Sequence, residues 1–218
     1  MSARTSTSLD MRGKTITTFI AYETLQRLAG LADGDTLDLL TDASDAIDND
    51  IRAWCHARGQ ELVAAEDTDG SQRYRITKGP LRPSGKCFAA VISDAGLEEL
   101  LSPLGFALAA ALEGSDVSLY FQGPAVRVLA SGFTEHLHGP GRAFSRFARA
   151  GLTRAGHLPA QEKLRQLRAL GARLYACGPS MQHFKVAKGD LAFDGVTIAE
   201  YLTFIEAMAH ADVNVFVQ

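Results

Sequence analysis

The sequence predicts a small α+β domain followed by an α/β domain with a doubly wound, mostly parallel sheet. Residues 78–86, KGPLRPSGK, place two prolines and two glycines between a strand-like run and a fresh apolar strand, which is typical of a domain boundary. Two helices and short strands precede this break, whereas apolar strands and helices alternate after it. We therefore expect a first domain over residues 1–79, a linker over 80–86 and a second domain over 87–218.

Two helices and three strands are predicted in the first domain. Ser44 is a suitable N-cap for the second helix, and Gly59 is a suitable residue to end it. The predicted inner face of this helix consists of Ile47, Ile51, Trp54 and Cys55. The helices are predicted over residues 18–29 and from Ser44 to about 58, and the strands over 35–41, 61–66 and 73–77.

Strands and helices alternate in the second domain, and the strands are near-continuous apolar runs, as in parallel sheets. Residues 131–158 form an irregular insert rich in Gly, His and Arg, and long inserts of this kind are usually functional or mobile. The strands are predicted over 87–93, 117–122, 173–177 and 213–217, and the helices over 97–112, 125–130, 159–170, 179–186 and 197–210.

The composition excludes several classes of protein. The chain has 218 residues, of which 46% are hydrophobic, and a net charge of -3, which predicts neither nucleic-acid binding nor membrane association. Its three cysteines are too few and too widely spaced for a disulfide framework or a zinc finger. No signal-peptide core or transmembrane segment is evident, so we expect a cytoplasmic protein.

Cys177 is the strongest candidate for chemistry. It closes a predicted parallel strand just before a helix, which is where sites form in open α/β sheets. Backbone N–H groups at the start of a helix favour a thiolate, so we expect Gly178 and Ser180 to stabilise one, the latter also through its hydroxyl. Ser93, at the end of the first strand, is expected to line the same crevice. The spacing alone supports equally a second interpretation, in which Cys177 is a small buried core residue.

Other candidate groups are weaker. Cys55 lies on the inner face of a helix and Cys87 begins a strand at the end opposite to where sites form, so both are predicted to be core residues. His136 and His138 form an H-x-H pair, but no carboxylate cluster completes a set of ligands, so no metal site is predicted. Residues 139–144, GPGRAF, lack the third glycine of a dinucleotide loop, and no cofactor is predicted.

Basic residues gather from Arg142 to Arg168 and are opposed there only by Glu162. Helical spacing places Arg142, Arg146 and Arg149 on one face. Such a run is usually a solvated face, and the alternative is a docking surface for an acidic protein or an anionic ligand.

Residues 9–78 resemble the TusA/SirA family of sulfur carriers. The resemblance implies that the first domain is a two-layer βαβαββ sandwich. The matching features are Leu9-Asp10-x-Arg12-Gly13, Gly34-Asp35, Asp42, Asp50-Ile51, Trp54-Cys55, Gly59-x-Glu61-Leu62 and Ile76-x-Lys78.

The sulfur-binding motif of that family is absent. The family carries its sulfur on a Cys-Pro-x-Pro motif just after the glycine, and the aligned stretch here is Ile16-Thr17-Thr18-Phe19. A persulfide needs a thiolate, which isoleucine cannot supply. We therefore expect the first domain to be a degenerate docking module.

Residues 87–218 resemble the DsrE/DsrF/DsrH-like family, whose members pass a persulfide sulfur between cysteines. Cys177 falls on a cysteine typical of this subfamily, so the resemblance implies a reactive thiol there. It also implies sulfur-donor or sulfur-acceptor proteins as partners, and a homo-oligomer. The matching segments are Val91-Ile92-Ser93, 176–181 (ACGPSM), 188–191 (KGDL), Asp194-Gly195-Val196 and Ala211-Asp212-Val213.

The expected function is that of a sulfur-relay or sulfurtransferase-like protein with a persulfide on Cys177. The alternative is a non-catalytic binding or assembly protein in which Cys177 is structural and the Arg-rich insert binds the partner. A flavodoxin-like nucleotide binder has only the fold for support.

Overall fold

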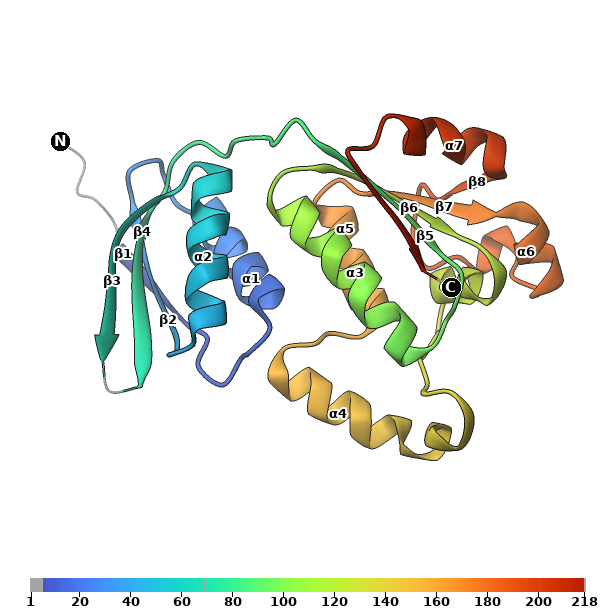
Figure 1. Cartoon of the computed structure of the whole chain (residues 1–218), viewed down its shortest axis with the longest axis horizontal. Helices are drawn as coiled ribbons and strands as arrows, with labels where there is room; N and C mark the ends of the chain where they lie inside the picture. The colour runs from blue at the N-terminus through green and yellow to red at the C-terminus, as the bar shows by residue number, and fades with distance from the viewer. Residues whose placement is uncertain (1–5, 69, 218) are drawn as a thin grey trace. The chain divides into compact units, whose positions relative to one another are not determined.

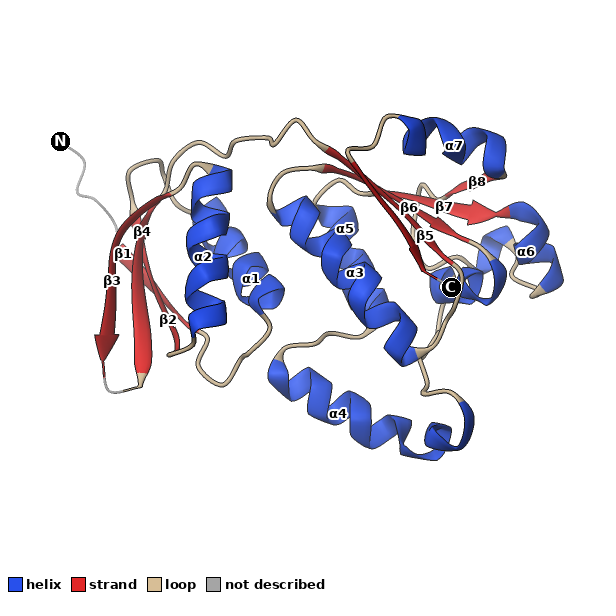
Figure 2. Cartoon of the chain, viewed as in Figure 1, coloured by secondary structure: helices blue, strands red, loops and turns tan. Residues whose placement is uncertain are grey.

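The structure is a computed structural model that describes residues 6–68 and 70–217. The chain divides into two compact units, the first mainly up to Ser84 and the second mainly from Gly85 onward. Residues 1–5 of the predicted first domain lie outside the described residues. Figure 1 colours the chain along its length, and Figure 2 distinguishes helices from strands.

The first unit is a mixed sheet with two helices on one face, as the βαβαββ prediction requires (Figure 2). Its strands lie in the order β1-β2-β4-β3, in which β1 is parallel to β2 and β4 is antiparallel to both of its neighbours. The elements are β1 (Ser6–Asp10), α1 (Thr17–Ala29), β2 (Thr36–Asp42), α2 (Asp45–Arg58), β3 (Glu61–Thr68) and β4 (Ser71–Thr77).

The alternation of buried residues in the strands and the helical spacing of apolar residues explain the fold of this unit. Every second residue of β2 is buried, which turns Leu37 and Leu39 toward the helices. The four apolar residues predicted for the inner face of α2 are the buried residues of that helix. The helix ends at Gly59, whose φ of 71° lies in the left-handed region that glycine adopts without strain.

The second unit contains a five-stranded parallel sheet in the order β8-β7-β6-β5-β9. The chain adds β6, β7 and β8 on one side of β5 and then returns to add β9 on the other, so the sheet is doubly wound, as predicted. Figure 1 shows α3 and α5 on one side of the sheet and α7 on the other. The strands are β5 (Cys87–Ile92), β6 (Asp116–Phe121), β7 (Arg173–Cys177), β8 (Thr197–Ala199) and β9 (Val213–Val217), and the helices are α3 (Leu97–Leu112), α5 (Ala160–Ala169), α6 (Gly178–His183) and α7 (Tyr201–Ala209).

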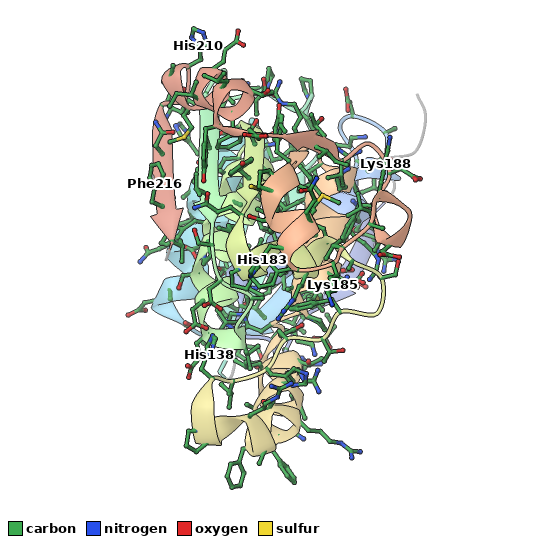
Figure 3. The ribbon with its side chains drawn as sticks, turned by 90° about the vertical axis from the view of Figure 1, so that its right-hand side faces the viewer. His138, His183, Lys185, Lys188, His210 and Phe216 are labelled. Atoms are coloured by element: carbon green, nitrogen blue, oxygen red, sulfur yellow. The ribbon has the colours of Figure 1, made fainter. Side chains whose placement is uncertain are left out.

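The two faces of this sheet are covered unequally. Helix α7 contributes one buried residue, Phe204, which stacks on Tyr120 with ring centroids 5.0 Å apart and meets Tyr175 edge-on. Phe216 on the edge strand β9 stays 64% exposed (Figure 3), and Leu202 of α7 is 89% exposed. The sheet face that contains Tyr120 is therefore only partly covered by α7, whereas α3 and α5 cover the opposite face.

Two local predictions were wrong, and one predicted helix is of the 3-10 type. Residues 123–129 form this 3-10 helix, η1 (Gly123–Leu129), where a helix was predicted over 125–130. Residues 197–210 are not one helix, because Thr197–Ala199 pair with β7 before α7 begins at Tyr201. The insert is not irregular throughout, since it contains η2 (Gly139–Phe144) and α4 (Ser145–Ala155). Helix α4 buries only Ser145, and its Phe147 side chain is exposed.

Within the described part of the chain, no helix has the length and apolar character needed to cross a bilayer.

Two buried ionisable residues, Lys163 of α5 and Glu135 of the insert, lie near one another. Lys163 and Glu135 are both 4% exposed, and they line a small cavity beside α3. Burial lowers the pKa of Lys163 to about 8, and the charge of Glu135 opposes that shift. The folded state therefore binds the Lys163 proton less tightly than the unfolded chain does.

We expect the stability of the wild type to rise relative to that of a Lys163→Met variant as the pH increases from about 8 to about 10.4. In this window the unfolded chain retains the proton that the folded chain has lost, which adds about 3 kcal/mol to the free energy of unfolding. Chemical unfolding followed by circular dichroism at several pH values measures the difference. The exposed Lys188→Met variant is the control, and a wild-type-minus-Lys163→Met difference that does not change with pH would contradict the prediction.

Candidate functional site

Three strand ends meet at one edge of the parallel sheet. Ile92, Phe121 and Ala176 are paired in register across β5, β6 and β7. The next residue of each strand, Ser93, Gln122 or Cys177, therefore lies at the same level of the carboxyl edge. The Gln122 Nε2 group donates a hydrogen bond to Ser93 Oγ at 3.0 Å. The structure thus brings Ser93 and Cys177 to the same edge, with Gln122 between them.

Cys177 lies against a buried tyrosine. The thiol residue is 4% exposed and pairs with Ala199 of β8, whereas Tyr120 of β6 is 1% exposed. Among the described residues, the Tyr120 hydroxyl has no partner in hydrogen-bonding geometry. Burial raises the pKa of Tyr120, and the neighbouring Cys177 side chain raises it further. A buried, unpaired O–H donor therefore stands beside the sulfur, where it can donate to a thiolate or a persulfide anion.

A groove of about 250 Å³ lies on the same face of the sheet, between the strands and α7. Tyr120 belongs to the wall of this groove and also contacts Cys177, so the Tyr120 side chain separates the Cys177 sulfur from the groove. No charged side chain is among the lining residues, which are Val91, Tyr120, Gln122, Tyr201, Phe204, Ile205, Met208 and Phe216.

Ser180 and Gly178 lie beside the thiol in the chain but serve other contacts. The Gly123 N–H donates to Ser180 Oγ at 2.9 Å, so this hydroxyl joins α6 to η1. No hydrogen bond links Ser180 to Cys177 within the described residues. Gly178 begins α6, and a Cβ placed there would stand 3.6 Å from Ile198 of β8, which is an ordinary contact.

Comparisons with known proteins follow the same division of the chain. Residues 86–216 match the model of the DsrE/DsrF-like family, which is more than half of the sequence. The chain belongs to the DsrE/DsrF-like family. Residues 21–78 of this DsrE/DsrF-like protein match the model of Sulfurtransferase TusA, so both resemblances seen in the sequence are confirmed, in the expected order.

Among solved structures, the ychN protein from E. coli is similar to the DsrE/DsrF-like protein at 15% identity. The match covers 60% of this chain and 98% of that one, with a TM-score of 0.42. No curated protein matches the chain. The two family assignments together indicate a role in sulfur relay in general.

The stretch that the sequence resemblance aligned with the family's sulfur-binding motif, residues 16–19, precedes the matched range and contains no cysteine. Helix α1 begins at Thr17 after Ile16, and Ile16 makes no capping hydrogen bond. The Thr17 hydroxyl donates to Asp50 Oδ2 of α2, so a carboxylate stands beside the first turn of α1. A helix N-terminus favours an anion, and in this DsrE/DsrF-like protein Asp50 already supplies one.

Cys55 and Cys87 have surroundings unlike those of Cys177. Cys55 is fully enclosed in the first unit, and burial raises its pKa to about 12. Cys87 is half-buried at the amino end of β5, where its backbone N–H donates to Asp212 Oδ2 at 2.8 Å.

Two sets of residues at the carboxyl edge of the sheet were not predicted from the sequence. Tyr120 and Gln122 are brought to Cys177 by the pairing of β6 with β7. Their proximity to Cys177 could be predicted only from the parallel register of these two strands. His138 meets Asp94 and Glu99, two carboxylates that precede it by about 40 residues in the chain. Asp94, which directly follows the strand predicted over 87–93, was the signal in the sequence for the cluster of Asp94, Glu99 and His138.

We expect Cys55 to resist alkylation in the native protein. At pH 8, a thiol with a pKa of about 12 is a thiolate in about one molecule in ten thousand, and burial also excludes the reagent. Peptide mapping by mass spectrometry after iodoacetamide treatment should find Cys55 unmodified in buffer and fully modified in denaturant. Modification of Cys55 in buffer as fast as Cys87 would contradict this account of its surroundings.

Replacing Ile16 with cysteine is not expected to restore a reactive carrier thiol. The Asp50 carboxylate beside α1 disfavours a second negative charge, so an Ile16→Cys variant should react with iodoacetamide at neutral pH about tenfold more slowly than the Ile16→Cys/Asp50→Asn double variant. Rates measured by mass spectrometry in a background lacking Cys177 test this. Equal rates would show that Asp50 does not influence the site.

Proposed function

We propose that this DsrE/DsrF-like protein relays sulfane sulfur and carries it as a persulfide on Cys177. The observation that supports the proposal most directly is the proximity of Cys177 to the buried Tyr120 hydroxyl, which has no geometric hydrogen-bond partner among the described residues. An unsatisfied buried hydroxyl costs about 1–3 kcal/mol, so its retention beside a thiol is accounted for if it serves the loaded sulfur.

The transfer step needs no cofactor. The Cys177 thiolate attacks the outer sulfur of a donor persulfide, a new S–S bond forms, and the donor's own S–S bond breaks so that the donor leaves as a thiolate. The product is a Cys177 persulfide, whose terminal sulfur accepts a hydrogen bond from Tyr120. An acceptor thiolate then removes that sulfur by the same exchange and regenerates the Cys177 thiolate.

Access to the sulfur runs through the groove under α7. Phe204 is the one buried residue of α7. The free energy that keeps α7 on the sheet is therefore of the order of that gained by burying one aromatic side chain, about 1.5–3 kcal/mol. A shift of α7 or a rotation of Tyr120 opens the wall that separates the groove from Cys177. The apolar lining of the groove limits water around the persulfide once the wall closes.

The TusA-like domain acts in this proposal as a docking module for a sulfur-transfer partner. Its sheet and two helices are intact, whereas the sequence resemblance aligns Ile16, which precedes α1, with the carrier cysteine. A folded domain without its reactive group retains the surface by which such domains are recognised.

A second candidate is a non-catalytic binding or assembly protein, and the enclosure of Cys177 favours it. In that case Cys177 and Tyr120 are packing residues, and the Arg-rich insert binds an acidic partner. Native-state alkylation separates the two candidates, because only a relay protein must expose Cys177 during its cycle.

We expect the wild-type protein, incubated with a small-molecule persulfide such as glutathione persulfide, to gain one sulfur atom on the Cys177 peptide in mass spectra. A Cys177→Ser variant should not load at that peptide, whereas the matched Cys87→Ser variant should load as the wild type does. Tyr120→Phe should load about tenfold more slowly, because one hydrogen bond to a charged sulfur is lost while the ring packing on Phe204 is kept. Total loading of Cys177→Ser equal to that of the wild type would end the proposal.

A further inference from the structure

Three side chains of ligand type meet beside the first strand of the parallel sheet. Asp94 follows β5, Glu99 lies in the first turn of α3, and His138 lies in the insert, toward the end of the sheet at which the strand arrowheads point (Figure 3). One ligand atom from each lies within 4.8 Å of the others. The insert is fixed here by its backbone, because the Leu97 N–H donates to the His136 carbonyl at 2.9 Å.

One nitrogen faces two carboxylate oxygens. His138 Nε2 lies 2.9 Å from Asp94 Oδ1 and 3.2 Å from Glu99 Oε2. This nitrogen can hold a single proton, which can be directed to only one of the two oxygens. Glu99 Oε2 is inaccessible to solvent and has no hydrogen-bond partner among the described residues. A cation between the three atoms satisfies both carboxylates at once.

The spacing of the three atoms suits a tetrahedral ion. Zinc binds imidazole nitrogen and carboxylate oxygen at about 2.0–2.2 Å, which separates two ligand atoms by about 3.3–3.5 Å. The two separations in the protein, both measured from His138 Nε2, are slightly shorter, so a small outward movement of the exposed His138 side chain admits the ion. His138 is 55% exposed, which leaves the fourth position open to water.

Gly96 makes room for this cluster. A Cβ at position 96 would overlap both the Glu99 carboxylate and the His138 ring. Its backbone N–H also donates to Asp94 Oδ1 at 2.7 Å, which orients that carboxylate toward the histidine. The close approach of the three ligands therefore depends on a residue that has no side chain.

We propose that Asp94, Glu99 and His138 form a zinc-binding site with water as the fourth ligand. The site is independent of the persulfide chemistry proposed for Cys177. It joins the loop after β5, helix α3 and the insert, three segments that are otherwise linked here by backbone contacts.

Titration of the chelator-treated full-length protein with Zn²⁺, in competition with a chromophoric chelator, tests the site. We expect one equivalent of zinc per chain. His138→Ala should weaken binding at least about a hundredfold, whereas His136→Ala, which removes an imidazole two residues away, should change it less than about twofold. Cys177→Ser should bind zinc as the wild type does, which separates this site from the thiol.

Gly96→Ala provides a variant that keeps all three ligands. Its added methyl group should push Glu99 and His138 apart and weaken zinc binding at least about tenfold. Substitution with Co²⁺ in the wild type should give the visible absorption of a four-coordinate ion, and the variant should lose it. Thermal unfolding confirms that each variant is folded. Zinc binding by His138→Ala at wild-type affinity, or no saturable binding by the wild type, would overturn the proposal and leave an ion pair only.

Discussion

The in-register pairing of β5, β6 and β7 is the constraint on which the candidate site depends. Parallel pairing places equivalent residues at one level, so Ser93 and Gln122, which follow β5 and β6, form a row with Cys177, the last residue of β7. Side chains alternate between the faces of a sheet, and a slip of one residue in β7 would turn Cys177 away from Tyr120 and toward α3 and α5. Neighbouring apolar strands therefore fix both the position of the thiol and the hydroxyl that faces it.

Local patterns predicted the elements of the site but not their neighbours. An apolar run followed by Gly178-Pro179 was enough to place Cys177 at the end of a strand before a helix. The contact with Tyr120 joins residues that are 57 positions apart in the chain, and only the order and register of the strands bring them together. Ser180 illustrates the opposite case: it is close to Cys177 in sequence, yet its hydroxyl is bonded to Gly123.

The insert, residues 131–158, contains structure that was not predicted from the sequence. Helix α4 buries only Ser145, and the helical spacing of Arg146 and Arg149 was the signal for it in the sequence. His138 gains its two carboxylates through the fold, because the backbone near His136 pairs with the segment that precedes α3. The family resemblance, by contrast, predicted both folds correctly, because the spacing of glycines and apolar residues that identifies each family is the same spacing that builds it.

Ile16 at the start of the first helix has a consequence for kinetics. Two reactive sulfurs in one polypeptide would exchange at a rate set by their tether, equivalent to a local concentration of about millimolar. A chain with isoleucine at one of the two places has no such internal route. In the relay proposed for Cys177, each handover then requires a collision with another molecule, so the rate of transfer grows with the abundance of that molecule and falls on dilution.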